Sequence, residues 1–220
     1  MKICKYGITL SLLRQEDIEF VSTMLVDTDE QTANSPKLEK VKLELKQKTE
    51  EMAALKNLYY IIEYKEDKIG LISEKELDWE TRSSEIELII WNETQTEIPV
   101  SVLAMLCLLE NGFNYLGWNA YTTRCADIKM IDMLKKLGFR NDSKTEQDRF
   151  ELNRHRFETG AAAELAQAKA YLDEKSGEGY LLLESDDYKT GMGQHYESHF
   201  LESGIYLHRR GIKGDRMYFR

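Results

Sequence analysis

The sequence has little of what several common classes of protein require. Only three of its 220 residues are cysteines, Cys4, Cys107 and Cys125, and their spacing matches no metal-binding pattern. We interpret them as reduced thiols, since two of them lie in apolar segments. No apolar run approaches the length of a membrane span, and the apolar stretch near the N-terminus is too short for a signal peptide. A cytoplasmic protein without membrane contact is therefore expected.

Positive charge is also scarce. The chain has 30 Lys and Arg against 39 Asp and Glu, which gives a net charge of −9. Nucleic-acid binding favours clustered positive charge, so a nucleic-acid partner is not expected. The charge fits a cationic small-molecule partner, although acidity is common and does not prove one. The length and the 42% hydrophobic content suit one domain of ordinary size with an appendage, or two small domains.

Strand and helix patterns alternate over the first two-thirds of the chain. Ser35 and Pro36 are typical of an N-cap and a first helical residue. A tight polar turn around Asp67 and Gly70 predicts an antiparallel hairpin. The predicted order is β-α-α-β-β-β-α-β-α-β, with strands at 8–13, 58–64, 68–77, 83–91, 119–125 and 148–157 and helices at 14–25, 36–55, 99–114 and 128–138.

The last third of the chain predicts a small α+β extension. Residues 158–175 have a helical composition, 177–184 read as a short strand, and 204–220 read as a hairpin. His195 and His199 lie four residues apart on a predicted helix and could face one metal ion. Their order, HYESH, lacks the metalloprotease arrangement and a third ligand, so no metal is assigned. We expect one domain at 1–158 and an extension at 159–220.

Several of these segments resemble the GNAT superfamily of acyl-CoA N-acyltransferases. The helix ending LKKLGFR and the opening TLSLLRQEDIEFV are similar to the branch that acetylates ribosomal-protein N-termini and related amines. The segments IIEYKEDKIGLIS, SSEIELIIW and LLENGFNYLGWNAYTTRC follow in the order of that branch. The resemblance covers about 150 residues. It implies an α/β (α+β) fold with a mixed, mostly antiparallel central sheet flanked by helices.

The resemblance also implies a binding mode for acetyl-CoA as co-substrate. The fourth and fifth strands of the family splay apart, and the pantetheine arm bonds to backbone groups at the strand edge, here Ile89, Ile90 and Trp91. The pyrophosphate lies on N–H groups at the start of the next helix, where unsatisfied donors and partial positive charge coincide. The acceptor amine then attacks the thioester directly.

The pyrophosphate motif of the family, Q/R-x-x-G-x-G/A, aligns with residues 95–100, and the stretch ETQTEIPVS around it contains no glycine. Pro99 removes one N–H donor, and Glu97 places a carboxylate near the pyrophosphate. The remaining donors belong to the backbone, and an exposed carboxylate costs only about 0.5–1 kcal/mol. We therefore expect binding that is weakened but not abolished. The alternative is an ordinary strand-to-helix turn with Pro99 at the first helical position. The expected coenzyme contacts are Gln95, Thr96, Glu97, Ile98, Val100 and Ser101.

Two positions near the fifth strand also depart from the family pattern. Asp127 stands where the family commonly carries a coenzyme-binding asparagine, but aspartate is favoured as an N-cap, and we prefer the interpretation that it caps the helix that follows. Leu134 stands where many members carry a tyrosine that protonates the departing thiolate. The ribosomal-protein-like branch often lacks that tyrosine.

Glu85 and Glu87 are the candidates for the general base. Alternation along a strand places both on one face, opposite Ile86 and Leu88, and neighbouring carboxylates can raise one another's pKa. The alternative is a solvent-facing strand surface. We favour Glu85, because the family carries a glutamate at the corresponding place more often.

The function that these features imply is acetylation of a primary amine, on a small molecule or a peptide N-terminus. The alternative is a GNAT-fold protein that no longer catalyses and serves as a binding module. The sequence does not identify the acceptor, and it leaves the oligomeric state open, a homodimer included.

Overall fold

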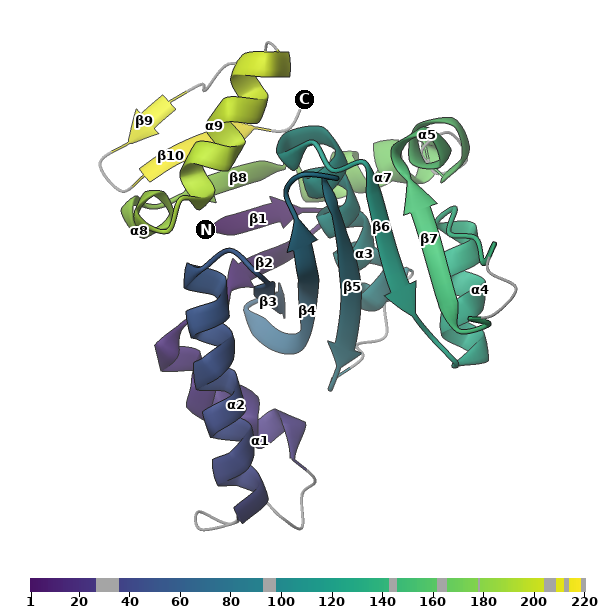
Figure 1. The fold of residues 1–220 in the computed structure, drawn as a ribbon. Helices are drawn as coiled ribbons and strands as arrows, with labels where there is room; N and C mark the ends of the chain where they lie inside the picture. Colours follow the sequence, from purple (N-terminus) through teal and green to yellow (C-terminus); the bar gives the residue numbers. More distant parts are fainter. Residues whose placement is uncertain are drawn as a thin grey trace.

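A ten-stranded sheet forms the centre of the molecule, with the order β7-β6-β5-β4-β3-β2-β1-β8-β10-β9 (Figure 1). All neighbouring strands are antiparallel except β5 and β6, which are parallel. This confirms the expected mixed, mostly antiparallel sheet. The computed structural model describes residues 1–26, 36–92, 98–142, 146–161, 166–177, 179–203, 209–211 and 214–218.

The elements follow the predicted order in the first two-thirds of the chain. The strands are β1 Lys2–Lys5, β2 Ile8–Leu12, β3 Leu58–Tyr64, β4 Asp67–Asp78, β5 Ser83–Ile90, β6 Ala120–Arg124, β7 Arg149–Asn153, β8 Tyr180–Leu183, β9 Arg209–Gly211 and β10 Gly214–Tyr218. The helices are η1 Gln15–Asp17, α1 Ile18–Leu25, α2 Pro36–Ala53, α3 Val100–Asn111, η3 Gly112–Leu116, α4 Ile128–Lys136, α5 Arg154–Arg156, η4 Phe157–Ala161, α7 Ala166–Ser176, α8 Ser185–Lys189 and α9 Met192–Ser203.

Two tight turns lie at one end of the sheet. Tyr6 and Gly7 join β1 to β2 with φ of 58° and 73°, and Lys65 and Glu66 join β3 to β4 with φ of 49° and 73°. Positive φ at both central residues is the type I′ geometry, which matches the twist of an antiparallel hairpin. The hairpin of β3 and β4 is therefore confirmed, with its turn at 65–66; Asp67 and Gly70, which we expected to flank it, belong to β4.

Different helices cover the two faces of the sheet. Side chains of α1 and α2 pack with Tyr59, Ile61 and Leu71 on one face, while α3 packs with Tyr60 and Ile72 on the other. Figure 1 shows α2 in front of the sheet and α3 behind it. None of the described helices has both the length and the apolar character of a membrane crossing.

The C-terminal part continues the sheet at its far edge. β8 pairs antiparallel with β1, with Ile3 opposite Leu181, and β10 pairs with β8, with Met217 opposite Leu181. The short strand and the hairpin expected in this part are present in its described residues. A separate unit at 159–220 remains a prediction, and β1, which joins the two parts, was not predicted.

Two predicted boundaries are wrong. The strand expected over 148–157 ends at Asn153, whose side-chain oxygen accepts a hydrogen bond from the N–H of Arg156 at 2.9 Å and so starts a short helix. The helix expected over 99–114 begins at Val100, because Pro99 has ψ of 137° and is its N-cap. Beyond Asn111 the helix continues as the π-helical turn η3. Ser35, the cap expected for α2, lies outside the described residues.

Candidate active site

The strands β5 and β6 diverge partway along their length. They pair in parallel from Ser83 opposite Ala120 to Ile86 opposite Thr123. β5 continues to Ile90 and remains paired with β4 throughout, whereas β6 ends at Arg124. Among the described residues, no strand pairs with the second edge of β5 from Glu87 to Ile90. Backbone groups along this edge are available to a ligand.

A cavity of about 320 Å³ lies where the strands diverge. Its walls come from β5, from α3, from the end of β6 and from the first turns of α4. The apolar part of the wall suits an alkyl chain, and its volume is in the range of small-molecule sites. The lining residues are Glu87, Leu88, Met105, Thr123, Arg124, Cys125, Ala126, Asp127, Met130 and Leu134.

The two glutamates proposed as bases lie on the front face of β5. Glu85 is opposite Lys75 of β4 and Glu87 is opposite Ser73, so both share the face that α2 covers further along the sheet. Figure 1 shows that no described helix crosses the front of β5 and β6. The expectation that both carboxylates share one face is confirmed by the register.

The surroundings of the two glutamates differ. Glu87 forms an ion pair with Lys75, and its side chain is 50% exposed. Glu85 is half-buried, is paired in the sheet on one side with Lys75 and on the other with Thr122, and makes no ion pair with any described residue. Of the two carboxylates, Glu85 is the one without an ion pair among the described residues, which favours it as a proton acceptor.

The backbone at the start of α3 does not need the glycines of the family motif. Neither Ile98 nor Val100 is among the described residues with positive φ, so the local backbone does not require glycine. The side chain of Val100 is fully buried in the core and that of Ile98 packs against it. Pro99 supplies the first helical acceptor, taking hydrogen bonds from the N–H groups of Val102 at 3.0 Å and Leu103 at 3.2 Å.

The remaining predicted coenzyme contacts lie in three parts of the chain. Ser101 lies in the first turn of α3 and is nearly buried. The last two residues of β5 are Ile89 and Ile90, and Trp91 follows them. The Trp91 indole donates a hydrogen bond to the carbonyl of Lys68 at 2.9 Å. Gln95, Thr96 and Glu97 lie outside the described residues.

Asp127 is the N-cap of α4. Its Oδ1 accepts a hydrogen bond from the N–H of Met130 at 2.9 Å, which confirms the capping interpretation. The residue also lines the cavity. Leu134, about two turns further along α4, is buried and lines the cavity as well. An alkyl group at this position cannot donate a proton to a leaving thiolate.

A buried carboxylate behind the site was not predicted. Glu74 of β4 is completely buried; its Oε1 accepts from Trp118 at 2.8 Å and from the Tyr121 hydroxyl at 2.7 Å, and its Oε2 accepts from Tyr60 at 3.1 Å. Burial raises the pKa of Glu74, and these three donors oppose the rise. Because Tyr121 belongs to β6, this network fixes one of the diverging strands.

Gly112 permits that network. A Cβ on this residue would lie 1.6 Å from the Tyr121 hydroxyl, so no other residue fits without displacing the tyrosine. In the sequence, Glu74 reads as one charge of an alternating, solvent-facing strand (SEKEL). Nothing in that local pattern indicates that its face meets two tyrosines and a tryptophan.

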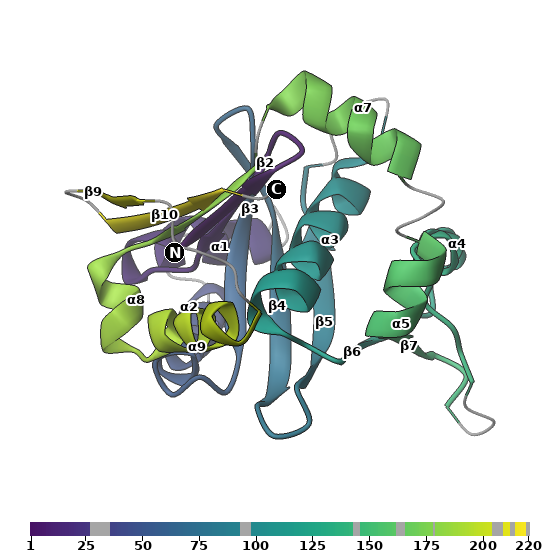
Figure 2. The ribbon, with the colours of Figure 1, turned by 90° about the horizontal axis from the view of Figure 1, so that it is seen from above.

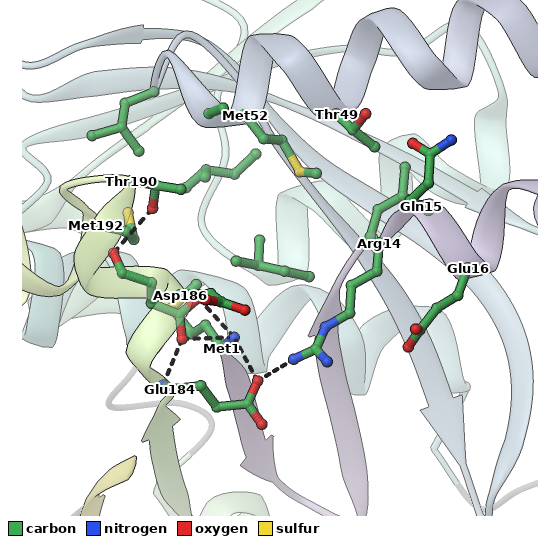
Figure 3. Close-up of a pocket in the computed structure, with 16 residues that line it drawn as sticks. Met1, Arg14, Gln15, Glu16, Thr49, Met52, Glu184, Asp186, Thr190 and Met192 are labelled. Atoms are coloured by element: carbon green, nitrogen blue, oxygen red, sulfur yellow. Dashed lines mark hydrogen bonds and ion pairs between the residues drawn. The ribbon is translucent and has the colours of Figure 1, made fainter. Parts of the chain in front are cut away.

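A second cavity, of about 420 Å³, lies away from the diverging strands (Figure 3). It is lined by the end of β2, the end of α2 and the segment around α8. The Met1 ammonium is held by Asp187 at 2.8 Å, and Arg14 pairs with Glu184. Leu12 of its wall and Leu88 of the first cavity belong to the same row across the sheet, three strand spacings or roughly 14 Å apart.

The two histidines of α9 serve packing. His195 stacks on Trp79 with ring centroids 3.7 Å apart, and burial lowers the pKa of His195. His199 lies 3.2 Å from the carbonyl of Asn114 through its Nε2. The described residues bring no three metal-ligating side chains together.

Several solved structures share this fold. A chimera of the spermidine N-acetyltransferase SpeG from Vibrio cholerae and hSSAT has 16% identity and a TM-score of 0.58, with 70% of this chain and 99% of that chain covered. FdhC, a nucleotide-linked sugar GNAT, has 17% identity and a TM-score of 0.62, with 78% and 98% covered. A probable acetyltransferase has 18% identity and a TM-score of 0.56, with 70% and 97% covered.

No family model and no curated protein matches the chain. At these identities the structural likeness shows the fold alone. The chain therefore has the GNAT fold, and the diverging β5 and β6 are the strands between which that fold was expected to open.

Proposed function

We propose that the protein is an acetyl-CoA-dependent N-acetyltransferase that acts on a primary amine of a small molecule or a peptide N-terminus. The observation that carries this proposal is the cavity at the divergence of β5 and β6, next to an unpaired strand edge. When bound, acetyl-CoA supplies the activated acyl group. The other roles fall to side chains and backbone groups of this chain.

The cleft has the features needed to hold the coenzyme. The edge of β5 from Glu87 to Ile90 offers backbone groups to the amides of the pantetheine arm. Met105, Met130 and Leu134 provide an apolar wall. The start of α3 carries the positive end of the helix dipole, which would favour a pyrophosphate there. The side chain of Val100 is buried in the core.

The acceptor amine would approach over the open front face. Glu85 would take the proton that the amine loses as it forms the amide bond, directly or through a water molecule. The departing thiolate of the coenzyme would take a proton from solvent, because Leu134 has none to give. Glu87 and Lys75 would contribute charge near the acceptor without exchanging a proton.

The structural neighbours support an amine as acceptor in general terms. Several of them are spermidine N-acetyltransferases, and one of these is dodecameric. Together with the net charge of −9, this makes linear polyamines the first acceptors to test. Peptides with a free N-terminus are the second, as the resemblance to the ribosomal-protein branch suggests.

The alternative is a non-catalytic GNAT-fold module. The absence of glycine from the stretch between β5 and α3 favours it. Calorimetric titration with acetyl-CoA, followed by a thiol-release assay with an amine panel, tests the two together. We expect heat on titration and amine-dependent release of thiol. Binding without release for any amine would favour the module, and no heat at millimolar acetyl-CoA would refute the enzyme.

A further inference from the structure

A third cavity, of about 410 Å³, lies at the end of the sheet that carries the two type I′ turns. The β1–β2 turn contributes Tyr6, the β3–β4 turn contributes Lys65, and α7 closes the cavity with Tyr171 and Lys175. Figure 2 shows α7 passing over this end of the sheet beside α3. The C-terminal extension thus completes the cavity.

This cavity is separate from the candidate active site. Leu103 of α3 lines it, whereas Met105 of the same helix lines the cleft between β5 and β6. Two residues along an α-helix correspond to a rotation of about 200°. The cleft between β5 and β6 and the third cavity therefore lie on opposite sides of α3, although Ile98, an expected coenzyme contact at the start of this helix, lines the third cavity.

The charged side chains that line the third cavity are lysines. Its described lining includes two lysines and no acidic residue, although the whole chain carries −9. Each ammonium is placed by an aromatic ring: Lys65 Nζ lies 5.1 Å from the centre of the Tyr64 ring, and Lys175 Nζ lies 4.4 Å from that of Tyr171. By contrast, the second cavity is lined by four carboxylates, two of which pair with the Met1 ammonium and Arg14.

The floor of the third cavity is apolar. Leu103 and Leu172 are 4% and 8% exposed, and Ile98 joins them. The ring of Tyr6 lines the wall, while its hydroxyl donates to Glu110 at 2.8 Å and is therefore already engaged. An apolar floor with a cationic rim matches a molecule that has an apolar body and one anionic group.

We propose that the cavity between α7, the start of α3 and the two hairpin turns binds a small amphipathic organic anion, with its apolar body on Leu103 and Leu172 and its anionic group between Lys65 and Lys175. This proposal does not depend on the acetyltransferase proposal. Attraction to two partly exposed ammonium groups adds to the burial of the apolar body.

Three eight-carbon probes test the proposal by calorimetry: octanoate, octanol and octylamine. We expect octanoate to bind the wild-type protein and to bind at least about tenfold more tightly than the other two. No heat with millimolar octanoate, or equal binding of octanol or octylamine, would overturn the proposal. Because the probes share their chain length, the comparison isolates the charge.

Charge-reversal variants locate the site. Lys65→Glu combined with Lys175→Glu should weaken octanoate binding about tenfold or more. The matched control is Lys40→Glu with Lys46→Glu, which changes the net charge equally at two exposed positions of α2 and should leave binding unchanged. Equal weakening in both double variants would show only a net-charge effect and would overturn the site.

Ala126→Trp, which fills the active-site cleft, gives the last control. Octanoate binding that survives this substitution belongs to the third cavity, and binding lost with it belongs to the cleft, which would overturn the proposal. The Lys65/Lys175 double variant should also retain its heat of acetyl-CoA binding. Failure of either proposal can therefore be told from failure of the other.

Discussion

Ile86 of β5 and Thr123 of β6 form the last cross-strand pair between the two parallel strands of the sheet. Ile86 is buried, and Thr123 lines the cavity that begins beyond the pair. The divergence has an identifiable cause: β6 ends one residue later, and Asp127 then caps α4. A paired sheet and an open cleft thus meet at a single position.

Filling that cleft should remove coenzyme binding without unfolding the protein. Ala126 is exposed and lines the cavity, so Ala126→Trp can place an indole in the space without displacing a core side chain. We expect acetyl-CoA affinity to fall at least about tenfold, since the bulky ring competes for the alkyl wall. Calorimetry measures the affinity, and thermal unfolding checks the fold.

Ile128→Trp is the control for this substitution. Ile128 lies two residues away and is 76% exposed, but it does not line the cavity. It should bind acetyl-CoA as the wild type does. If Ala126→Trp also binds normally, the coenzyme does not occupy the space between β5 and β6.

Segments with a strong periodic pattern were predictable from the sequence. LYYIIEY and SSEIELII form β3 and β5 as expected. The ends of both strands lie within a residue or two of the predicted positions. β1 was not predicted because its four residues have no strong pattern of their own. It exists through pairing with β2 and with β8, which lies almost at the other end of the chain.

The site was predictable only where a single strand or helix determines it. Alternation placed Glu85 and Glu87 on one face, and the cap preference of aspartate identified Asp127. The Lys75–Glu87 ion pair depends on the register between two strands, and the burial of Glu74 depends on β3, β6 and Trp118 together. Such relationships are properties of the tertiary structure.

Removing the cap at position 127 should cost stability. Asp127→Ala deletes the acceptor for the Met130 N–H, and loss of an N-cap typically costs about 1 kcal/mol. Asp127→Asn retains an acceptor oxygen and should lose much less. Urea denaturation measures both. Wild-type stability for Asp127→Ala together with a weakened acetyl-CoA affinity would instead assign this residue to the coenzyme.

The buried carboxyl of Glu74 should make stability depend on pH. Its pKa is raised in the folded protein, so the folded state holds the proton to higher pH than the unfolded state, where the pKa is about 4.3. The resulting stabilisation is complete below the unfolded pKa and is lost as pH rises through the folded pKa.

Glu74→Gln isolates this effect. Its amide oxygen can accept from Trp118 and Tyr121, and its amide nitrogen can donate to the Tyr60 hydroxyl, so the network persists. All other titrating groups are shared with the wild type. The unfolding free energy of the wild type should fall relative to that of the variant as pH rises from about 4 to 8. Parallel curves from urea denaturation would show that Glu74 does not titrate differently in the two states.

Glu85 and Glu87 allow a matched test of the proposed base. Both stand on the same face of β5, but only Glu87 forms an ion pair with Lys75 in the part of the chain that the structure describes. Glu85→Gln keeps the size of the side chain and removes its basicity, so turnover should fall about 10²-fold or more, the usual contribution of a general base. Glu87→Gln should lower turnover by much less. The thiol-release assay measures turnover, and calorimetry should give unchanged acetyl-CoA affinity for both variants. Equal turnover of Glu85→Gln and wild type, or a larger loss in Glu87→Gln, would remove Glu85 from the mechanism.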